Sequence, residues 1–188
     1  MDILHIIKNF NKANFTDRQY WVACHEAAHF VAAIHYRFGI FSVTLWKNSS
    51  KSGLLGQVHI DHDVTLGDLV ITAAGPAADF KMLSKTELSN DIGHKNELER
   101  IIKDTKAAFC NIYHELYIDD SEPSTEQIRA TLKKVSNEAT ILVNKNWDII
   151  EIVAKLFLSN RNKKGQIPLT KLKKIKTITK ELLEEKTI

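Results

Sequence analysis

The segment from Thr16 to Phe38 constrains the fold of this chain more than any other, because it is one long run of helix-forming residues. Thr16 and Gln19 have the spacing of a capping box, in which two side chains satisfy the free amides at the start of a helix. Gly39 comes directly after the run and favours its end there. The sequence therefore predicts a helix over residues 16–38, and its apolar flanks predict that other elements cover it.

Within this helix the motif His25-Glu26-Ala27-Ala28-His29 places three polar side chains between apolar flanks. Helix positions four apart are about 40° from eclipsed, so both imidazoles point to one side. Two such nitrogens can take adjacent corners of a zinc tetrahedron, and Glu26 is placed to accept a proton from water. A chance match is the alternative, but buried rings need the partners that a metal supplies. The motif predicts one Zn²⁺ per chain and a zinc metallopeptidase with Glu26 as general base.

A catalytic zinc usually has three protein ligands, so a third must come from elsewhere in the chain. By chemistry alone the candidates are Asp61, His62, Asp63, Asp79, Asp91 and His94. Position along the chain does not choose among them, because each also suits a loop, a cap or the surface. Asp91 in particular suits the first turn of a helix, where the macrodipole stabilises an acid.

The remaining pattern predicts a mainly α (α+β) fold with one small β-sheet and a helical C-terminal part. The expected elements are strands over residues 41–46 and 56–61, helices over 65–84, 91–117, 125–145 and 147–158, and a short final helix after a turn at 165–168. Pro76 lacks an amide donor, which predicts a kink or restart of its helix at Gly75-Pro76. We expect a single domain over 1–188, with a zinc-binding catalytic part to about residue 118 and a helical part from about 124.

Composition excludes several classes of protein. The 26 Lys and Arg against 23 Asp and Glu give a net charge of +3, so no nucleic-acid partner is expected. Cys24 and Cys110 are too few for a disulfide framework, and they suit a reducing cytoplasm. No apolar run reaches the roughly 20 residues of a membrane span, and the start lacks the plan of a signal peptide. A cytoplasmic protein is expected.

Several separate stretches resemble the peptidase domain of the FtsH-type, ATP-dependent zinc metalloproteases, from about residue 21 to the last helices. HEAAHFVAA resembles that family's HEAGH helix, FSVTLW with LLGQV resembles its substrate-side strand and glycine turn, and ITAAGPAADF resembles its LAGRAAE helix. LSNDIGHKNELERI resembles the segment that delivers an aspartate as third zinc ligand, and the last helices also look alike. The resemblance implies that His25, His29 and Asp91 hold the zinc and that Glu26 catalyses hydrolysis.

The chain also departs from the family. Ala28 replaces a glycine, Pro76 stands where arginine is typical, and Asp79 matches a glutamate that is not a ligand, so Asp79 is the weaker alternative to Asp91. The family's membrane anchor and its ATPase module, with a GxxxxGK[ST] loop, have no counterpart here. Either the chain cleaves peptides and unfolded segments alone, or a separate ATPase feeds it, or it is one domain of a longer protein. Its start at Met1 favours a complete short protein.

The predicted function is that of a zinc-dependent metalloendopeptidase acting on peptide or unfolded protein substrates, with the strand over 43–46 offering an edge to the substrate. The alternative is a non-catalytic zinc-containing module that acts through a protein partner, for which a fourth ligand such as His94 would close the site. A regulator-cleaving metallopeptidase with a glutamate ligand is less favoured, since ITAAGPAADF contains no glutamate. The sequence does not determine the substrate or the oligomeric state.

Overall fold

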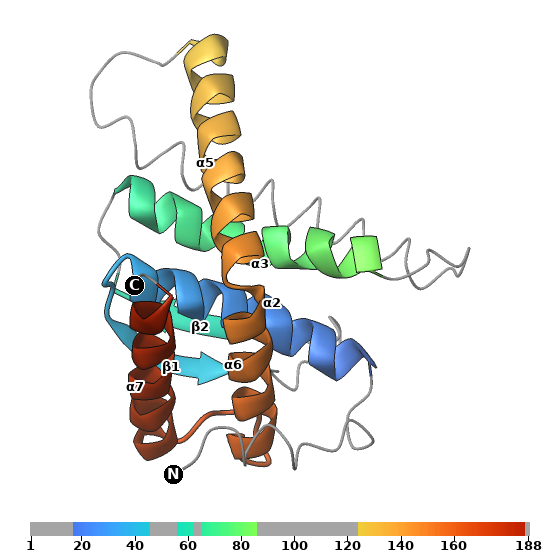
Figure 1. The fold of residues 1–188 in the computed structure, drawn as a ribbon, viewed down its shortest axis with the longest axis vertical. Helices are drawn as coiled ribbons and strands as arrows, with labels where there is room; N and C mark the ends of the chain where they lie inside the picture. Colours follow the sequence, from blue (N-terminus) through green and yellow to red (C-terminus); the bar gives the residue numbers. More distant parts are fainter. Residues whose placement is uncertain (1–16, 46–55, 62–64, 86–123, 187–188) are drawn as a thin grey trace.

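The computed structural model describes residues 17–45, 56–61, 65–85 and 124–186, and within them the chain is mainly helical (Figure 1). The elements in chain order are α2 (Asp17–His35), β1 (Ile40–Thr44), β2 (Gln57–Ile60), α3 (Leu66–Lys85), α5 (Thr125–Lys145), α6 (Trp147–Asn160) and α7 (Leu169–Glu185). The predicted class, mainly α with one small sheet, is confirmed. The helix expected over 91–117 lies outside the described residues.

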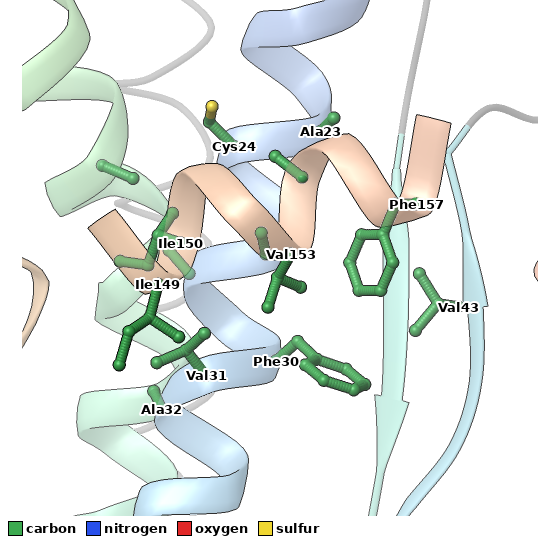
Figure 2. Close-up of a cluster of buried hydrophobic side chains, with 14 of the residues drawn as sticks. Ala23, Cys24, Phe30, Val31, Ala32, Val43, Ile149, Ile150, Val153 and Phe157 are labelled. Carbon is green, nitrogen blue, oxygen red and sulfur yellow. The ribbon is translucent and has the colours of Figure 1, made fainter. Parts of the chain in front are cut away.

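Helix α2 occupies the middle of the fold, and α3 and α6 pack against it (Figure 1). Most of its apolar residues are buried, including those in 22–24 and 30–33. Phe30 on α2 meets Phe157 on α6 edge to face, with ring centroids 5.1 Å apart, and Val43 of β1 lies beside them (Figure 2). Aromatic pairs prefer this geometry, which adds to the free energy gained by burying the rings.

The end of α2 differs from the expectation. The helix ends at His35, because Arg37 adopts a left-handed conformation with φ 64°. The amide of Arg37 donates to the carbonyl of Ile34 at 3.1 Å, and the amide of Phe38 donates to that of Ala33 at 2.8 Å. These two bonds form a Schellman motif, which usually has glycine where Arg37 stands. The predicted end at Phe38 was wrong because the chain uses this arginine, rather than the later glycine, to stop the helix.

Of the two outcomes predicted at Gly75-Pro76, a kink or a restart, the restart does not occur, since α3 continues from Leu66 to Lys85. Proline removes one intrahelical hydrogen bond and crowds the preceding turn. Residues on both sides of the proline are nevertheless buried, among them Val70, Ala74 and Ala78. Packing of this helix against α2 and α5 therefore outweighs the local cost.

The two strands form the predicted antiparallel pair, and the structure corrects which edge is exposed. Ile40 pairs with Ile60 and Thr44 with Gln57, with a register irregularity near the start of β1. On its other side β1 bonds to the segment 165–167, because Leu45 donates to the Gly165 carbonyl at 2.9 Å and Ile167 donates to the Val43 carbonyl at 3.0 Å. The edge expected to receive a substrate is therefore occupied, and in the described part of the chain β2 is the outer strand.

The C-terminal helices agree closely with the expected spans. Helix α5 has the bounds 125–145, and α6 runs two residues beyond the expected 158. Helix α7 has 17 residues and is longer than the short helix expected. Ile150, Val153 and Phe157 of α6 are fully buried against α2. No helix in the described ranges has the length and apolar character needed to cross a membrane.

Cys24 is buried in the core and has no disulfide. Burial raises the pKa of its thiol to about 12, so the thiol stays protonated at neutral pH. The expected role of this cysteine as a reduced packing residue agrees with its position.

The left-handed residue at the end of α2 allows a stability test. Replacing Arg37 by glycine should raise the free energy of unfolding by about 1 kcal/mol, because glycine adopts this conformation without a Cβ penalty. Urea denaturation measures the change. Arg37→Ala is the matched control, since it removes the side chain and keeps the strain. Equal stability of the two variants would contradict the assignment of strain at this position.

Candidate metal centre

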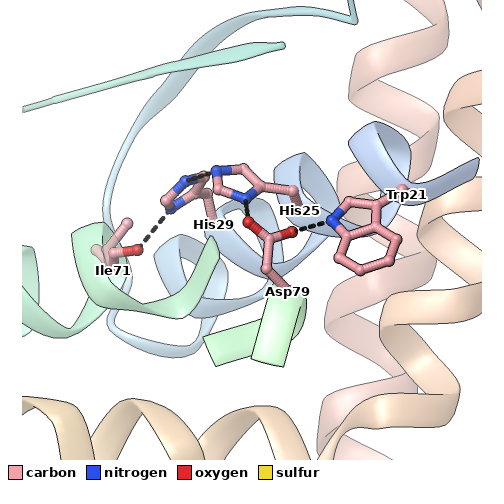
Figure 3. Close-up of polar contacts among 5 residues, drawn as sticks. All are labelled: Trp21, His25, His29, Ile71 and Asp79. Carbon is pink, nitrogen blue, oxygen red and sulfur yellow. Dashed lines mark hydrogen bonds and ion pairs between the residues drawn. The ribbon is translucent and has the colours of Figure 1, made fainter. Parts of the chain in front are cut away.

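Two histidine rings from consecutive turns of α2 meet at one point (Figure 3). The Nε2 atoms of His25 and His29 are 3.1 Å apart, and the ring planes lie at 76° to each other. Adjacent corners of a tetrahedron with metal–nitrogen distances of 2.0 to 2.1 Å are about 3.3 Å apart. The spacing of four residues on a helix has therefore produced a pair of nitrogens with nearly the separation that one zinc ion requires.

The opposite nitrogen of each ring is held by helix α3 (Figure 3). Nδ1 of His29 donates to the carbonyl oxygen of Ile71 at 2.7 Å, and Nδ1 of His25 lies 2.8 Å from Oδ2 of Asp79. A carbonyl oxygen and a carboxylate accept hydrogen bonds, so each Nδ1 carries the proton and each Nε2 has the lone pair when its ring is neutral. These partners fix ring tautomer and orientation, as they do for histidine ligands of metals.

His29 is neutral at physiological pH. Burial, together with the nearby ring of His25, lowers the pKa of His29 to about 3. A metal ligand must be deprotonated at the coordinating nitrogen, so this environment removes the competition from a proton. Nε2 of His29 can therefore serve as a ligand without first losing a proton.

Gly75 lies directly beside the two nitrogens. A Cβ built at this position would lie 2.3 Å from Nε2 of His29 and 2.5 Å from Nε2 of His25. No side chain could occupy that place without displacing the rings. The glycine thus lets the backbone of α3 approach the nitrogens closely, and the residues present fit a small cation held by two imidazoles.

Glu26 is 4% exposed and lies against the start of β2. A Cβ at Gly56 would lie 2.1 Å from Cγ of Glu26 and 2.3 Å from its Oε1. The backbone that leads into β2 therefore touches the side chain that the sequence assigns as general base. A Cβ at this position would force the Glu26 side chain to move.

The structure separates the remaining ligand candidates. Asp79 is 2% exposed, and both its oxygens are engaged, Oδ1 by Nε1 of Trp21 at 2.6 Å and Oδ2 by His25. It orients a histidine from the Nδ1 side and is not placed as a ligand. Asp61 directly follows β2 and is exposed to solvent. The candidates that lie outside the described residues are His62, Asp63, Asp91 and His94.

Within the described ranges no three His, Cys, Asp or Glu side chains are grouped closely enough to hold a metal ion. This part of the chain offers two candidate nitrogens, and the assignment of Asp91 as third ligand stays a prediction.

Sequence reasoning missed the groups that position the two histidines. Trp21 and the Ile71 carbonyl carry no recognisable motif, and Asp79 was considered only as a ligand. One signal was present for Trp21, which precedes His25 by four residues and so shares its side of the helix. The glycine before Pro76 was another, since glycine inside a helix often marks a close approach.

The chain matches no protein-family model and no curated protein in the comparisons made. The likeness to FtsH-type peptidases therefore rests on the motifs alone. The function proposed below rests on those motifs together with the geometry of the site.

A substitution at Gly75 tests whether the two Nε2 atoms beside it bind a metal. Alanine favours a helix over glycine by about 1 kcal/mol, so Gly75→Ala should not weaken α3 by propensity. Its methyl group would instead overlap the two Nε2 atoms, and we expect loss of bound zinc, measured by elemental analysis of the purified protein. Gly67→Ala on the same helix is the matched control, because its Cβ would meet Tyr36 at 3.1 Å and not the histidines. Wild-type zinc content in Gly75→Ala would contradict the proposed position of the metal.

Proposed function

We propose that this chain is a zinc-dependent metalloendopeptidase that hydrolyses peptide bonds in peptides or unfolded proteins. The observation that carries the proposal is the pair of Nε2 atoms, 3.1 Å apart, on the same helix as Glu26. Two neutral imidazoles held in this way direct two lone pairs toward each other, and a cation between them would remove that repulsion. Zinc suits this donor set, because imidazole nitrogens are common zinc ligands.

His25, His29 and Asp91 are the proposed ligands, and Glu26 is the proposed general base. When bound, zinc supplies a Lewis acid that polarises the scissile carbonyl and acidifies water. Glu26 accepts a proton from the attacking water and then returns it to the leaving amine. Its contact with the backbone of Gly56 limits the rotamers that it can adopt, which favours a fixed position for both transfers. Asp79 keeps Nδ1 of His25 occupied so that Nε2 faces the metal.

The proposed substrate binds in extended form along β2. The inner edge of β2 pairs with β1, and β1 is covered on its far side by residues 165–167. Gly56 directly precedes β2 and touches Glu26, so a peptide added to this strand would run past the general base. Backbone hydrogen bonding of this kind accepts many sequences, provided that the chain is extended. Unfolded segments are therefore the proposed substrates, and a separate ATPase is the proposed partner for folded ones.

We place this activity in the cytoplasm on the strength of composition. Two cysteines, one of them buried as a thiol, suit a reducing compartment.

Metal analysis of four proteins tests the ligand set. We expect one zinc per chain in the wild type and its loss in His25→Ala and Asp91→Ala, because each removes one of three ligands. Asp61→Ala is the matched control, since it removes an exposed carboxylate that was also a candidate, and it should retain zinc. If Asp91→Ala kept its zinc and Asp61→Ala lost it, Asp61 rather than Asp91 would be the third zinc ligand.

Substitution of Glu26 by glutamine tests the reaction. The variant should keep its zinc and lose at least about 10²-fold in cleavage rate, because an amide cannot accept the proton from water. Hydrolysis of an unfolded, casein-like protein measures the rate, and a chelator should abolish it in the wild type. Unchanged turnover in Glu26→Gln would overturn the assignment. Zinc without any cleavage in the wild type would favour the alternative, a zinc-containing binding module.

A further inference from the structure

The indole of Trp21 contacts the polar groups behind the two histidines (Figure 3). It lies one turn before His25 on α2, and both residues reach the same carboxylate on α3. Nε1 of Trp21 donates to Oδ1 of Asp79 at 2.6 Å, while Oδ2 of Asp79 receives Nδ1 of His25 at 2.8 Å. The three side chains therefore form a line of two hydrogen bonds that ends at a proposed zinc ligand.

We propose that Trp21 is a positioning residue for the metal site and acts through Asp79. A carboxylate with one partner can rotate about its last torsion, where the preference is broad. The indole N–H removes that freedom, because it holds Oδ1 from a ring that is itself partly buried. Oδ2 is then fixed toward His25, and Nε2 of His25 is fixed toward the metal. This inference rests on one part of the proposed function, namely that the chain binds zinc. It does not require that the chain cleaves peptides.

The chemistry of indole suits this role better than that of other donors. Its N–H donates one hydrogen bond, accepts none and carries no charge. A lysine or arginine at the same place would neutralise Asp79 and weaken its effect on His25, whereas a neutral donor leaves the negative charge available to the imidazole. Asp79 is 2% exposed, so no bulk water substitutes for the indole as second donor.

A double-mutant cycle on zinc affinity tests the proposal without relying on peptide hydrolysis. Zinc is titrated against a chromophoric chelator for the wild type, Trp21→Phe, Asp79→Ala and the double variant. Partners that orient a metal ligand are worth about 10- to 100-fold in affinity. We expect Trp21→Phe to weaken zinc binding about tenfold, Asp79→Ala to weaken it more, and the double variant to match Asp79→Ala. Circular dichroism of the metal-free proteins confirms that each is folded.

Trp147→Phe is the matched control. It removes an indole from the start of α6, where the ring lies under Lys81, and zinc affinity should be unchanged. If Trp21→Phe does not fold, a measurement on the wild-type protein tests the proposal instead. Zinc addition should shift the NMR resonance of the Trp21 indole N–H more than that of Trp147, because only Trp21 is joined to a ligand.

The outcomes separate the two proposals. Zinc binding that is unaffected by Trp21→Phe would overturn the positioning role and leave the peptidase intact, as would an indole resonance of Trp21 that does not move. A further tenfold loss on adding Trp21→Phe to Asp79→Ala would also overturn it, because Trp21 would then act by packing alone. Failure of the wild type to bind zinc would overturn the proposed function together with this inference.

Discussion

The burial of α2 is the constraint on which the rest of the structure depends. Helices α3 and α6 cover it, and most of its side chains between residues 22 and 33 are apolar and have no contact with water. Burying a large apolar side chain contributes roughly 1.5 to 3 kcal/mol, so this helix anchors the core. The same burial restricts the access of solvent to polar atoms on α2, and His25 and His29 are only partly exposed. His25 and His29 must then find their partners on the helix that covers them, and Asp79 and the Ile71 carbonyl fill that need.

Close approach of backbones, made possible by two glycines, gives the candidate site its shape. At Gly75 the backbone of α3 lies against the imidazole nitrogens, and at Gly56 the chain entering β2 lies against Glu26. Neither position has room for a Cβ. Functional groups held between rigid elements keep their geometry better than groups carried on loops. The site is therefore organised by how closely the main chains of α3 and β2 can pack on α2.

Some elements were predictable because their determinants are local. Helix α5 has the predicted bounds, since polar breaks flank a clear helical period. The end of α2 and the free edge of β1 were predicted wrongly, and the restart of α3 that was one of two outcomes predicted at Pro76 does not occur. In each case a contact from another part of the fold, or an arginine in a conformation that usually requires glycine, outweighed the local preference.

The sequence by itself determined that two histidines and a glutamate share one helix and that the two imidazoles point the same way, because four residues make slightly more than one helical turn. Tertiary structure alone decided what lies behind each ring. The Ile71 carbonyl and the Asp79 carboxylate are 42 and 54 residues from the histidines they meet, and Trp21 is 58 residues from Asp79. Contacts over such separations depend on how the whole core packs, and no short pattern in the chain encodes them.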